Sequence, residues 1–229
     1  MIKWLTYGYF VLGPIALQAT SVYCIHGFMR SANSMKFIGA SLEKAGYKPY
    51  LFGYPSRDGT IFDHSILLVE SLKQEALLHP GKPIHFVTHS MGGIVLRAAI
   101  NHPECPKEAK IGRAVLLSPP NQGSLFGQFL NKFTLIKNYV GPYAGKELLT
   151  EKNFNHFGDF PRSMKVFVIS GTLGLNPTIK EANDGKVGVQ EARLNTPHEH
   201  CTIFTSHSWM IYSIPTIKKT TLFIISGEL

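Results

Sequence analysis

The sequence predicts an α/β fold, with helices flanking a mostly parallel central sheet of about six strands. Two observations lead to this prediction: short apolar runs recur along the chain, and the longer segments between them have helical spacing. A third is size, because 229 residues with 44% hydrophobic side chains can bury one large core. Strands that alternate with helices form parallel sheets whose two faces are both covered.

The predicted strands are rich in β-branched and aromatic residues, and each ends near a Gly, Ser, Pro or His. In chain order they are Ser21–Ile25, Tyr50–Gly53, Ile84–Thr88, Ala114–Ser118, Val166–Ser170 and Cys201–Thr205. In a parallel sheet, ligands bind beyond the carboxyl ends of the strands. The residues that follow each strand are therefore the first candidates for function.

Apolar residues spaced three or four apart predict a helix in each gap between the first four strands. The residues on this face, apolar apart from Ser41, are Phe37, Ala40, Ser41, Leu42 and Ala45 in the first gap, Ile66, Val69, Leu72 and Ala76 in the second, and Ile94, Val95, Ala98 and Ala99 in the third. No internal repeat or linker-like tract interrupts the chain. Residues 21–229 are therefore predicted to form a single domain.

An uncharged apolar stretch from Trp4 to Leu17 precedes the first strand, so residues 1–20 are treated as a separate hydrophobic segment. Three interpretations stay open: an export signal, an interfacial anchor that touches a membrane surface, or an arm packed on the domain. The stretch is shorter than the roughly 20 residues that a helix needs to span a bilayer. It slightly favours export or membrane association over a cytoplasmic location.

The formal net charge of +8 would suit an anionic partner. The longest basic cluster is only Lys218-Lys219, however, and aromatic residues do not alternate with Arg or Lys, so nucleic-acid binding is not expected. The cysteines Cys24, Cys105 and Cys201 lack CxxC spacing. Neither a disulfide framework nor a zinc site is predicted from them.

Residues 86–95, FVTHSMGGIV, place a serine between an apolar strand and an apolar helix. Gly92 and Gly93 would each cost about 1 kcal/mol relative to alanine inside a helix, so a close contact is expected to require them. A sharp turn here would hold Ser90 exposed above the sheet, beside a helix N-terminus whose dipole favours a developing oxyanion. The alternative is a glycine-rich helix start with an incidental serine.

This pattern resembles the G-x-S-x-G nucleophile elbow of the α/β-hydrolases, in the H-S-M-G-G form of small lipases and esterases. Thr88 stands where the first glycine is usual, so the turn is expected to be slightly more open. The first strand ends in His26-Gly27-Phe28, which is similar to the H-G-x segment of the same superfamily. The resemblance implies that Ser90 is the nucleophile and that the main-chain N–H groups of Phe28 and Met91 form the oxyanion hole.

The resemblance also implies an acid and then a base downstream of the serine, each on a loop after a strand. His207 directly follows the last predicted strand, and Asp184 lies in an Asn-Asp-Gly turn after the preceding one. Asp184 and His207 are therefore the predicted acid and base. Position in this order alone does not exclude Asp159 or Glu181 as the acid, and an Asp-Gly turn without chemistry is the other interpretation of Asp184.

His198 and His200 alternate before Cys201 and could bind a metal ion, but a third and a fourth ligand are not evident. No metal is therefore predicted. The serine chemistry implied by the resemblance needs no organic cofactor either.

The connection 121–161 is long and mixes apolar residues with glycines and lysines. It is either a small cap over the serine or the buried face of a crossover helix. His26, Phe126 and Phe129 are predicted to bind substrate, and a cap lined with Phe and Leu would favour acyl chains.

The expected activity is hydrolysis of carboxylic esters, lipids included, by a lipase or esterase through an acyl-enzyme. An acyltransferase or amidase that uses the same triad is one alternative. A catalytically silent binding protein on the same fold is the other.

Overall fold

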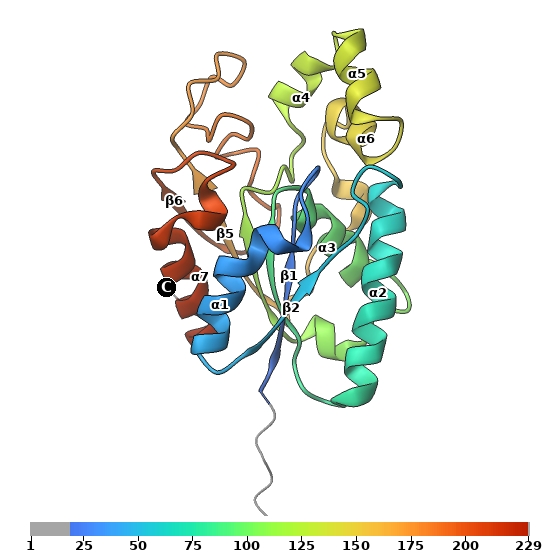
Figure 1. Cartoon of the computed structure of the whole chain (residues 1–229), viewed down its shortest axis with the longest axis vertical. Helices are drawn as coiled ribbons and strands as arrows, with labels where there is room; N and C mark the ends of the chain where they lie inside the picture. The colour runs from blue at the N-terminus through green and yellow to red at the C-terminus, as the bar shows by residue number, and fades with distance from the viewer. Residues whose placement is uncertain (1–18, 229) are drawn as a thin grey trace, which may run out of the picture.

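A computed structural model describes residues 19–228. At its centre is a six-stranded sheet with the order β2-β1-β3-β4-β5-β6, in which every neighbouring pair is parallel (Figure 1). The strands are β1 Ser21–Ile25, β2 Lys48–Phe52, β3 His85–His89, β4 Arg113–Leu117, β5 Lys165–Gly171 and β6 Glu199–Ile203. The predicted α/β fold is confirmed, and each predicted strand overlaps an observed one.

The two edge strands, β2 and β6, begin earlier than the sequence predicts. β2 starts with Lys48 and Pro49, and β6 starts with Glu199 and His200. None of these four residues is buried, because an edge strand has a neighbour on one side only. A prediction based on apolar runs therefore misses the partly exposed residues with which the edge strands begin.

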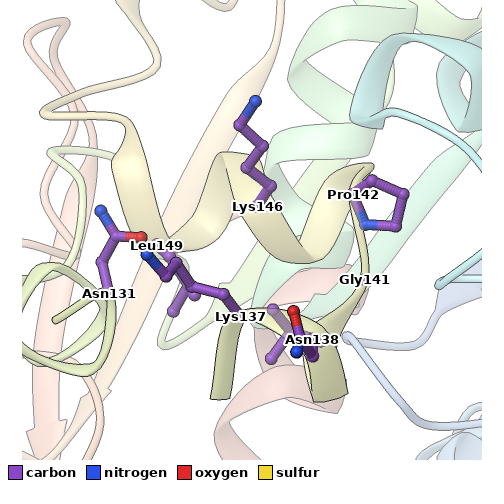
Figure 2. A pocket seen from close by; sticks show the side chains of 8 residues that line it. Asn131, Lys137, Asn138, Gly141, Pro142, Lys146 and Leu149 are labelled. Atoms are coloured by element: carbon purple, nitrogen blue, oxygen red, sulfur yellow. The ribbon is translucent and has the colours of Figure 1, made fainter. Parts of the chain in front are cut away.

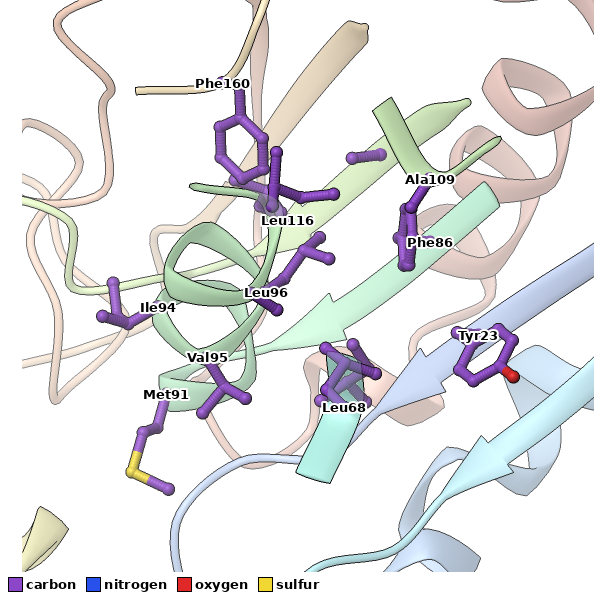
Figure 3. Close-up of a cluster of buried hydrophobic side chains, with 14 of the residues drawn as sticks. Tyr23, Leu68, Phe86, Met91, Ile94, Val95, Leu96, Ala109, Leu116 and Phe160 are labelled. Carbon is purple, nitrogen blue, oxygen red and sulfur yellow. The ribbon is translucent and has the colours of Figure 1, made fainter. Parts of the chain in front are cut away.

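Alternate residues of each strand pack on opposite faces of the sheet. Tyr23 and Ile25 of β1 join one hydrophobic cluster, which includes residues of α2 (Ile61–Leu78) and α3 (Met91–Asn101) (Figure 3). Val22 and Cys24 join the other, with residues of α1 (Lys36–Lys44) and α7 (Ile214–Ser226). Two helices thus cover each face, and the three predicted helices correspond to α1, α2 and α3 (Figure 1).

Three short helices connect β4 to β5, within what we call the β4–β5 segment (residues 121–161). They are α4 Leu125–Leu130, α5 Thr134–Val140 and α6 Ala144–Thr150. All three lie together at the top of the molecule as drawn in Figure 1, beyond one end of the sheet. The segment is therefore not a single crossover helix packed on a sheet face.

Short 3-10 helices complete the regular structure of the described residues: Ala32–Met35, Lys107–Lys110, Asn155–Phe157 and Met210–Tyr212. Among residues 19–228, no helix is both long enough and apolar enough to cross a membrane. The predicted hydrophobic segment 1–20 lies outside the described residues except for its last two. Its three interpretations stay predictions.

Candidate active site

Ser90 lies in the turn between β3 and α3, with backbone angles φ 54° and ψ −126°. A positive φ is strained for a residue with a Cβ atom and costs about 1 to 3 kcal/mol. Two main-chain hydrogen bonds hold it there: Ser90 N donates to Leu117 O at 2.8 Å, and Gly93 N donates to Ser90 O at 2.9 Å. The turn thus has the sharp geometry predicted for it.

Glycines surround Ser90 because other backbone passes too close for a side chain. A Cβ atom on Gly92 would lie 2.6 Å from His26 O and 2.7 Å from Ile25 O. One on Gly27 would lie 3.0 Å from the Cβ atom of Ser90. Any larger residue at position 92 would push the end of β1, at Ile25 and His26, away from Ser90.

Thr88 fits beneath the turn because Gly93 leaves room for it. The Thr88 side chain is fully buried, and a Cβ atom on Gly93 would lie 3.2 Å from its Oγ1 atom and 2.9 Å from the Cβ atom of Pro119. Within residues 19–228, Thr88 Oγ1 has no hydrogen-bond partner. Thr88 therefore acts as a space-filling residue here.

The structure brings Ser90, His207 and Asp184 together in a chain of hydrogen bonds. His207 Nδ1 lies 2.7 Å from Asp184 Oδ2, and His207 Nε2 lies 2.9 Å from Ser90 Oγ. The three residues follow β3, β6 and β5 respectively, so they meet at the carboxyl edge of the sheet. An imidazole that donates from Nδ1 to a carboxylate keeps Nε2 free to accept the serine proton.

The turn at Asn183 and Gly185 aims the Asp184 carboxylate at His207. Gly185 has φ 96°, and its N–H donates to Asn183 Oδ1 at 2.9 Å. The second Asp184 oxygen accepts N–H groups from Lys186 at 3.0 Å and from Val187 at 2.8 Å. Burial alone would raise the pKa of Asp184, but the His207 ring, the Val187 N–H and the Ser118 hydroxyl outweigh burial and hold the pKa below its usual range.

The two competing acids lie elsewhere. Asp159 forms an ion pair with the buried Arg97 at 3.3 Å. Glu181 accepts the main-chain N–H of Gln190 on both carboxylate oxygens, at 3.0 and 3.1 Å. Among residues 19–228, neither of them contacts His207, whereas Asp184 accepts a hydrogen bond from it directly.

The two predicted oxyanion donors lie on either side of Ser90. Phe28 follows Gly27, which packs against Ser90, and Met91 is the first residue of α3. Within the described chain, neither main-chain N–H is bonded to another protein group. Both are therefore available to a substrate oxygen.

A cavity of about 240 Å³ opens beside Ser90 and His207. The β4–β5 segment supplies most of its apolar lining, namely Phe126, Leu130, Val140, Leu148 and Leu149. Arg30 and Lys186 also line it, and none of its described lining residues is acidic. The cavity thus combines Ser90, which is hydrogen-bonded to His207, with an apolar wall and two cations.

Comparison with known proteins gives a clear result for structure and none for sequence. Neither a protein-family model nor a curated protein sequence matches the chain. Among solved structures, the chain is similar to the mature form of the lipase BlEst2 from Bacillus licheniformis, with a TM-score of 0.72 and 19% identity over 93% of this chain and 94% of that one. The chain has the α/β-hydrolase fold.

Two further solved structures share this α/β-hydrolase fold. A metagenomic carboxyl esterase, MGS0156, matches with a TM-score of 0.68 and 15% identity, over 92% of this chain and 75% of its own. The phospholipase PlaB from Legionella pneumophila matches with a TM-score of 0.64 and 17% identity, over 89% of this chain and 59% of its own. The resemblance inferred from the motifs is thus confirmed at the level of the fold.

Of the three predicted substrate-binding residues, only Phe126 lines the cavity. His26 is buried under the loop instead: its ring stacks on Tyr54 at 4.3 Å, and its Nδ1 lies 2.9 Å from Gly27 O. Phe129 packs edge-on against Phe133, with ring centroids 5.4 Å apart. Neither His26 nor Phe129 is among the described residues that line the cavity, so the prediction that they bind substrate finds no support in the cavity lining.

His89 is a site residue that the sequence did not single out. Its Nε2 lies 3.0 Å from the carbonyl oxygen of His207, so this nitrogen carries the proton and donates it. Burial, and then the neighbouring His207, lower the pKa of His89 to about 3, so the ring is neutral near pH 7. His89 thereby anchors the loop that carries His207. A histidine directly before the serine was the available clue.

A second cavity, of about 370 Å³, lies among α4, α5 and α6 (Figure 2). Polar side chains dominate its labelled lining, with Asn131, Lys137, Asn138 and Lys146. It shares Val140 and Leu149 with the Ser90 cavity. The two cavities therefore adjoin within the β4–β5 segment.

The two histidines considered as metal ligands bond to protein groups instead. His200 lies 3.0 Å from Ser170 Oγ through Nε2 and 3.2 Å from the Arg193 guanidinium through Nδ1. The His198 and His200 rings are 6.4 Å apart. Over residues 19–228, no group of three or more His, Cys, Asp or Glu side chains is arranged to hold a metal ion.

Proposed function

We propose that the chain hydrolyses carboxylic esters through an acyl-enzyme on Ser90. The observation that supports this most directly is a pair of hydrogen bonds: His207 Nδ1 donates to Asp184 Oδ2 at 2.7 Å, and the Ser90 hydroxyl donates to His207 Nε2 at 2.9 Å. A serine hydroxyl is a weak nucleophile until a base within hydrogen-bond reach can take its proton. Here that base is held and oriented by a carboxylate.

In the first half of the reaction, Ser90 Oγ attacks the carbonyl carbon while His207 Nε2 takes the hydroxyl proton. The carbonyl oxygen becomes an oxyanion that accepts N–H groups from Phe28 and Met91. The intermediate then collapses, the bond to the alcohol oxygen breaks, and His207 passes its proton to that oxygen. Loss of one oxyanion donor typically costs about 10²- to 10³-fold in rate.

Water completes the cycle. It attacks the acyl carbon while His207 Nε2 takes one of its protons, and the second intermediate releases the carboxylic acid as His207 returns a proton to Ser90 Oγ. Asp184 stays ionised throughout and stabilises the protonated imidazole, which its lowered pKa favours.

The lining of the cavity supports acyl groups as part of the substrate. Phe126, Leu130 and Leu148 come from helices above the sheet and present carbon atoms to the space beside Ser90. The similar solved structures are described as a lipase, a carboxyl esterase and a phospholipase, which agrees with an ester substrate.

A fluorophosphonate probe tests the proposal, because only an activated serine attacks such a reagent quickly. We expect the wild type to be labelled at Ser90, and Ser90→Ala to lose both labelling and hydrolysis of p-nitrophenyl butyrate while staying folded. Ser208→Ala is the matched control, because Ser208 lines the same cavity but it is the Ser90 hydroxyl that is hydrogen-bonded to the His207 ring. Labelling at another serine, or esterase activity in Ser90→Ala, would contradict the proposal.

A further inference from the structure

Arg30 and Lys186 are the only Lys, Arg, Asp or Glu residues on the described wall of the Ser90 cavity. Within residues 19–228, neither side chain forms an ion pair or a side-chain hydrogen bond. Lys73 on the surface is a contrasting case, because it forms ion pairs with Glu70 at 3.0 Å and with Glu104 at 2.8 Å. The described wall of the cavity therefore carries two cationic side chains that have no ion-pair partner.

Main-chain hydrogen bonds fix the position of the Arg30 backbone. Arg30 N donates to Gly27 O at 3.2 Å, which closes a tight turn after β1. Within that turn, Met29 has φ 54° and its N–H donates to Ser56 Oγ at 3.0 Å. Arg30 thus stands on the same short loop as the Phe28 N–H group.

Lys186 is held from two sides. Its N–H donates to Asp184 Oδ1 at 3.0 Å, and its carbonyl oxygen accepts the Ser124 hydroxyl at 3.1 Å. Desolvation, and then the Arg30 guanidinium, lower the pKa of Lys186, so the two cations are close enough to repel each other. The one acid nearby, Asp184, is already bonded to His207 and to two N–H groups.

Resting on the proposed function, we propose that the enzyme prefers esters that carry an anionic group, a carboxylate or a phosphate, which Arg30 and Lys186 bind beside the scissile bond. An anion would relieve the repulsion between the two cations and form charge-assisted hydrogen bonds with both. The cations come from the loops of Phe28 and Asp184, whereas the apolar wall comes from the β4–β5 segment. The favoured substrate is therefore amphiphilic, with an apolar acyl chain and a charged group.

Two matched pairs of soluble substrates test this preference. The first pair is the butyrate ester of 4-hydroxybenzoate and that of 4-hydroxybenzamide, which differ in charge and little in shape. The second is dihexanoyl phosphatidate and dihexanoylglycerol. For wild type we expect kcat/KM for the anionic member to exceed that for the neutral one by on the order of tenfold in at least one pair. Preference in the second pair alone points to a phosphate headgroup, and in the first alone to a carboxylate.

Charge-removing variants locate the effect. In the double variant Arg30→Gln with Lys186→Gln, the ratio of kcat/KM for the anionic ester to that for the neutral ester should fall to about one. Lys186→Arg should keep the wild-type ratio. Lys146→Gln is the matched control, because Lys146 lines the cavity of Figure 2 and not that of Ser90. Fluorophosphonate labelling of Ser90 shows whether each variant keeps an intact site.

Salt gives a readout that needs no variant, since raising ionic strength from about 0.05 to about 0.5 M screens the cations and should shrink the preference in wild type. Equal kcat/KM within both pairs, or a preference that survives in the double variant, overturns the inference while leaving ester hydrolysis in place. Failure to hydrolyse even the neutral esters would instead overturn the proposed function.

Discussion

The carboxyl edge of the sheet and the β4–β5 segment above it are built in different ways. At the edge, Asp184 and His207 are buried and hydrogen-bonded on several atoms. In the segment, α5 has no buried residue, and Leu135 and Tyr139 on it are 83% and 59% exposed. The difference indicates that Asp184 and His207 are held firmly by the core, while α5, which lies above the Ser90 cavity, is only lightly packed.

The two ends of the β4–β5 segment are tied firmly to the rest of the protein, for example by the Ser124 hydroxyl, which donates to Lys186 O, and by the Asp159–Arg97 ion pair. Fewer polar contacts hold its middle part, α5 and α6. Glu147 accepts the N–H of Ile61 at 2.7 Å, Ala144 N donates to Gly59 O at 3.0 Å, and the Arg57 guanidinium donates to Tyr139 O at 2.5 Å. Elements with few buried apolar contacts are the ones that open locally at low cost in free energy. Changes on α5, which has no buried residue, should therefore alter substrate choice more than stability.

The largest effect is expected at the rigid edge. Asp184→Asn keeps the shape of the loop but lets the His207 ring adopt the wrong tautomer, an exchange that lowers kcat by about 10⁴ in serine proteases. We expect a loss of at least on the order of 10²-fold in kcat with little change in KM. Steady-state kinetics on one soluble ester measure it.

Asp159→Asn and Glu181→Gln are the controls for this change, because these carboxylates bond to Arg97 and to Gln190 and not to His207. Both should stay within a few-fold of wild type in kcat. A near-normal Asp184→Asn enzyme would show that a different carboxylate orients the base.

A smaller and more selective effect is expected in the β4–β5 segment. Phe126→Ala removes part of the apolar wall beside Ser90, so kcat/KM for octanoyl esters should fall by about tenfold and that for acetyl esters should change little. The matched change Phe129→Ala should leave this chain-length profile unaltered, because Phe129 does not line the cavity. Equal losses on short and long esters would argue that Phe126 supports the structure and does not contact the acyl chain.

The last effect is on stability and not on catalysis, and it concerns the buried His85 at the start of β3. Burial, and then the charge of Arg113, lower the pKa of His85 from 6.5 to about 4, so below pH 6.5 the unfolded chain binds a proton that the folded chain does not. Stability is therefore lost as the pH falls from about 6.5 towards 4, by up to about 1.4 kcal/mol per pH unit for this group. Urea unfolding at pH 7.5 and pH 5 should show a smaller drop for His85→Gln than for wild type.

His156→Gln is the control for the acid experiment, since this histidine is exposed on the β4–β5 segment and its replacement should leave the drop unchanged. An identical drop in His85→Gln and wild type would mean that other groups cause the acid sensitivity.

The sequence predicts the fold well because buried parallel strands have little freedom in composition. Ala114–Ser118 stands out as a strand since all but its last residue must be apolar on both faces of the sheet. The edge strands are located less accurately, because Glu199 and His200 need not be apolar at the rim. The β4–β5 segment is the least predictable part, since no face of α5 is buried and thus no periodicity is imposed on it.

The candidate site is predicted where backbone geometry restricts the residue type, as at Ser90 with Gly92 and at Asp184 with Gly185. It is missed where only the direction of a side chain matters. His26 directly precedes Gly27 and Phe28 in sequence, but its ring stacks on Tyr54, whereas Arg30 lines the cavity from a position with no distinctive sequence neighbours. Sequence proximity does not specify that direction, so the two cations of the cavity emerge only from the structure.

His207 comes late in the chain, after β6, and this limits when during synthesis the proposed site can assemble. Ser90 follows the third strand of the chain, but His207 follows the sixth, which occupies an outer position in the sheet. Parallel pairing of this kind joins non-local parts of the chain. A nascent chain therefore cannot place His207 beside Ser90 until the stretch that carries His207 has left the ribosome, so the proposed base reaches the serine only after nearly all of the domain has been synthesised.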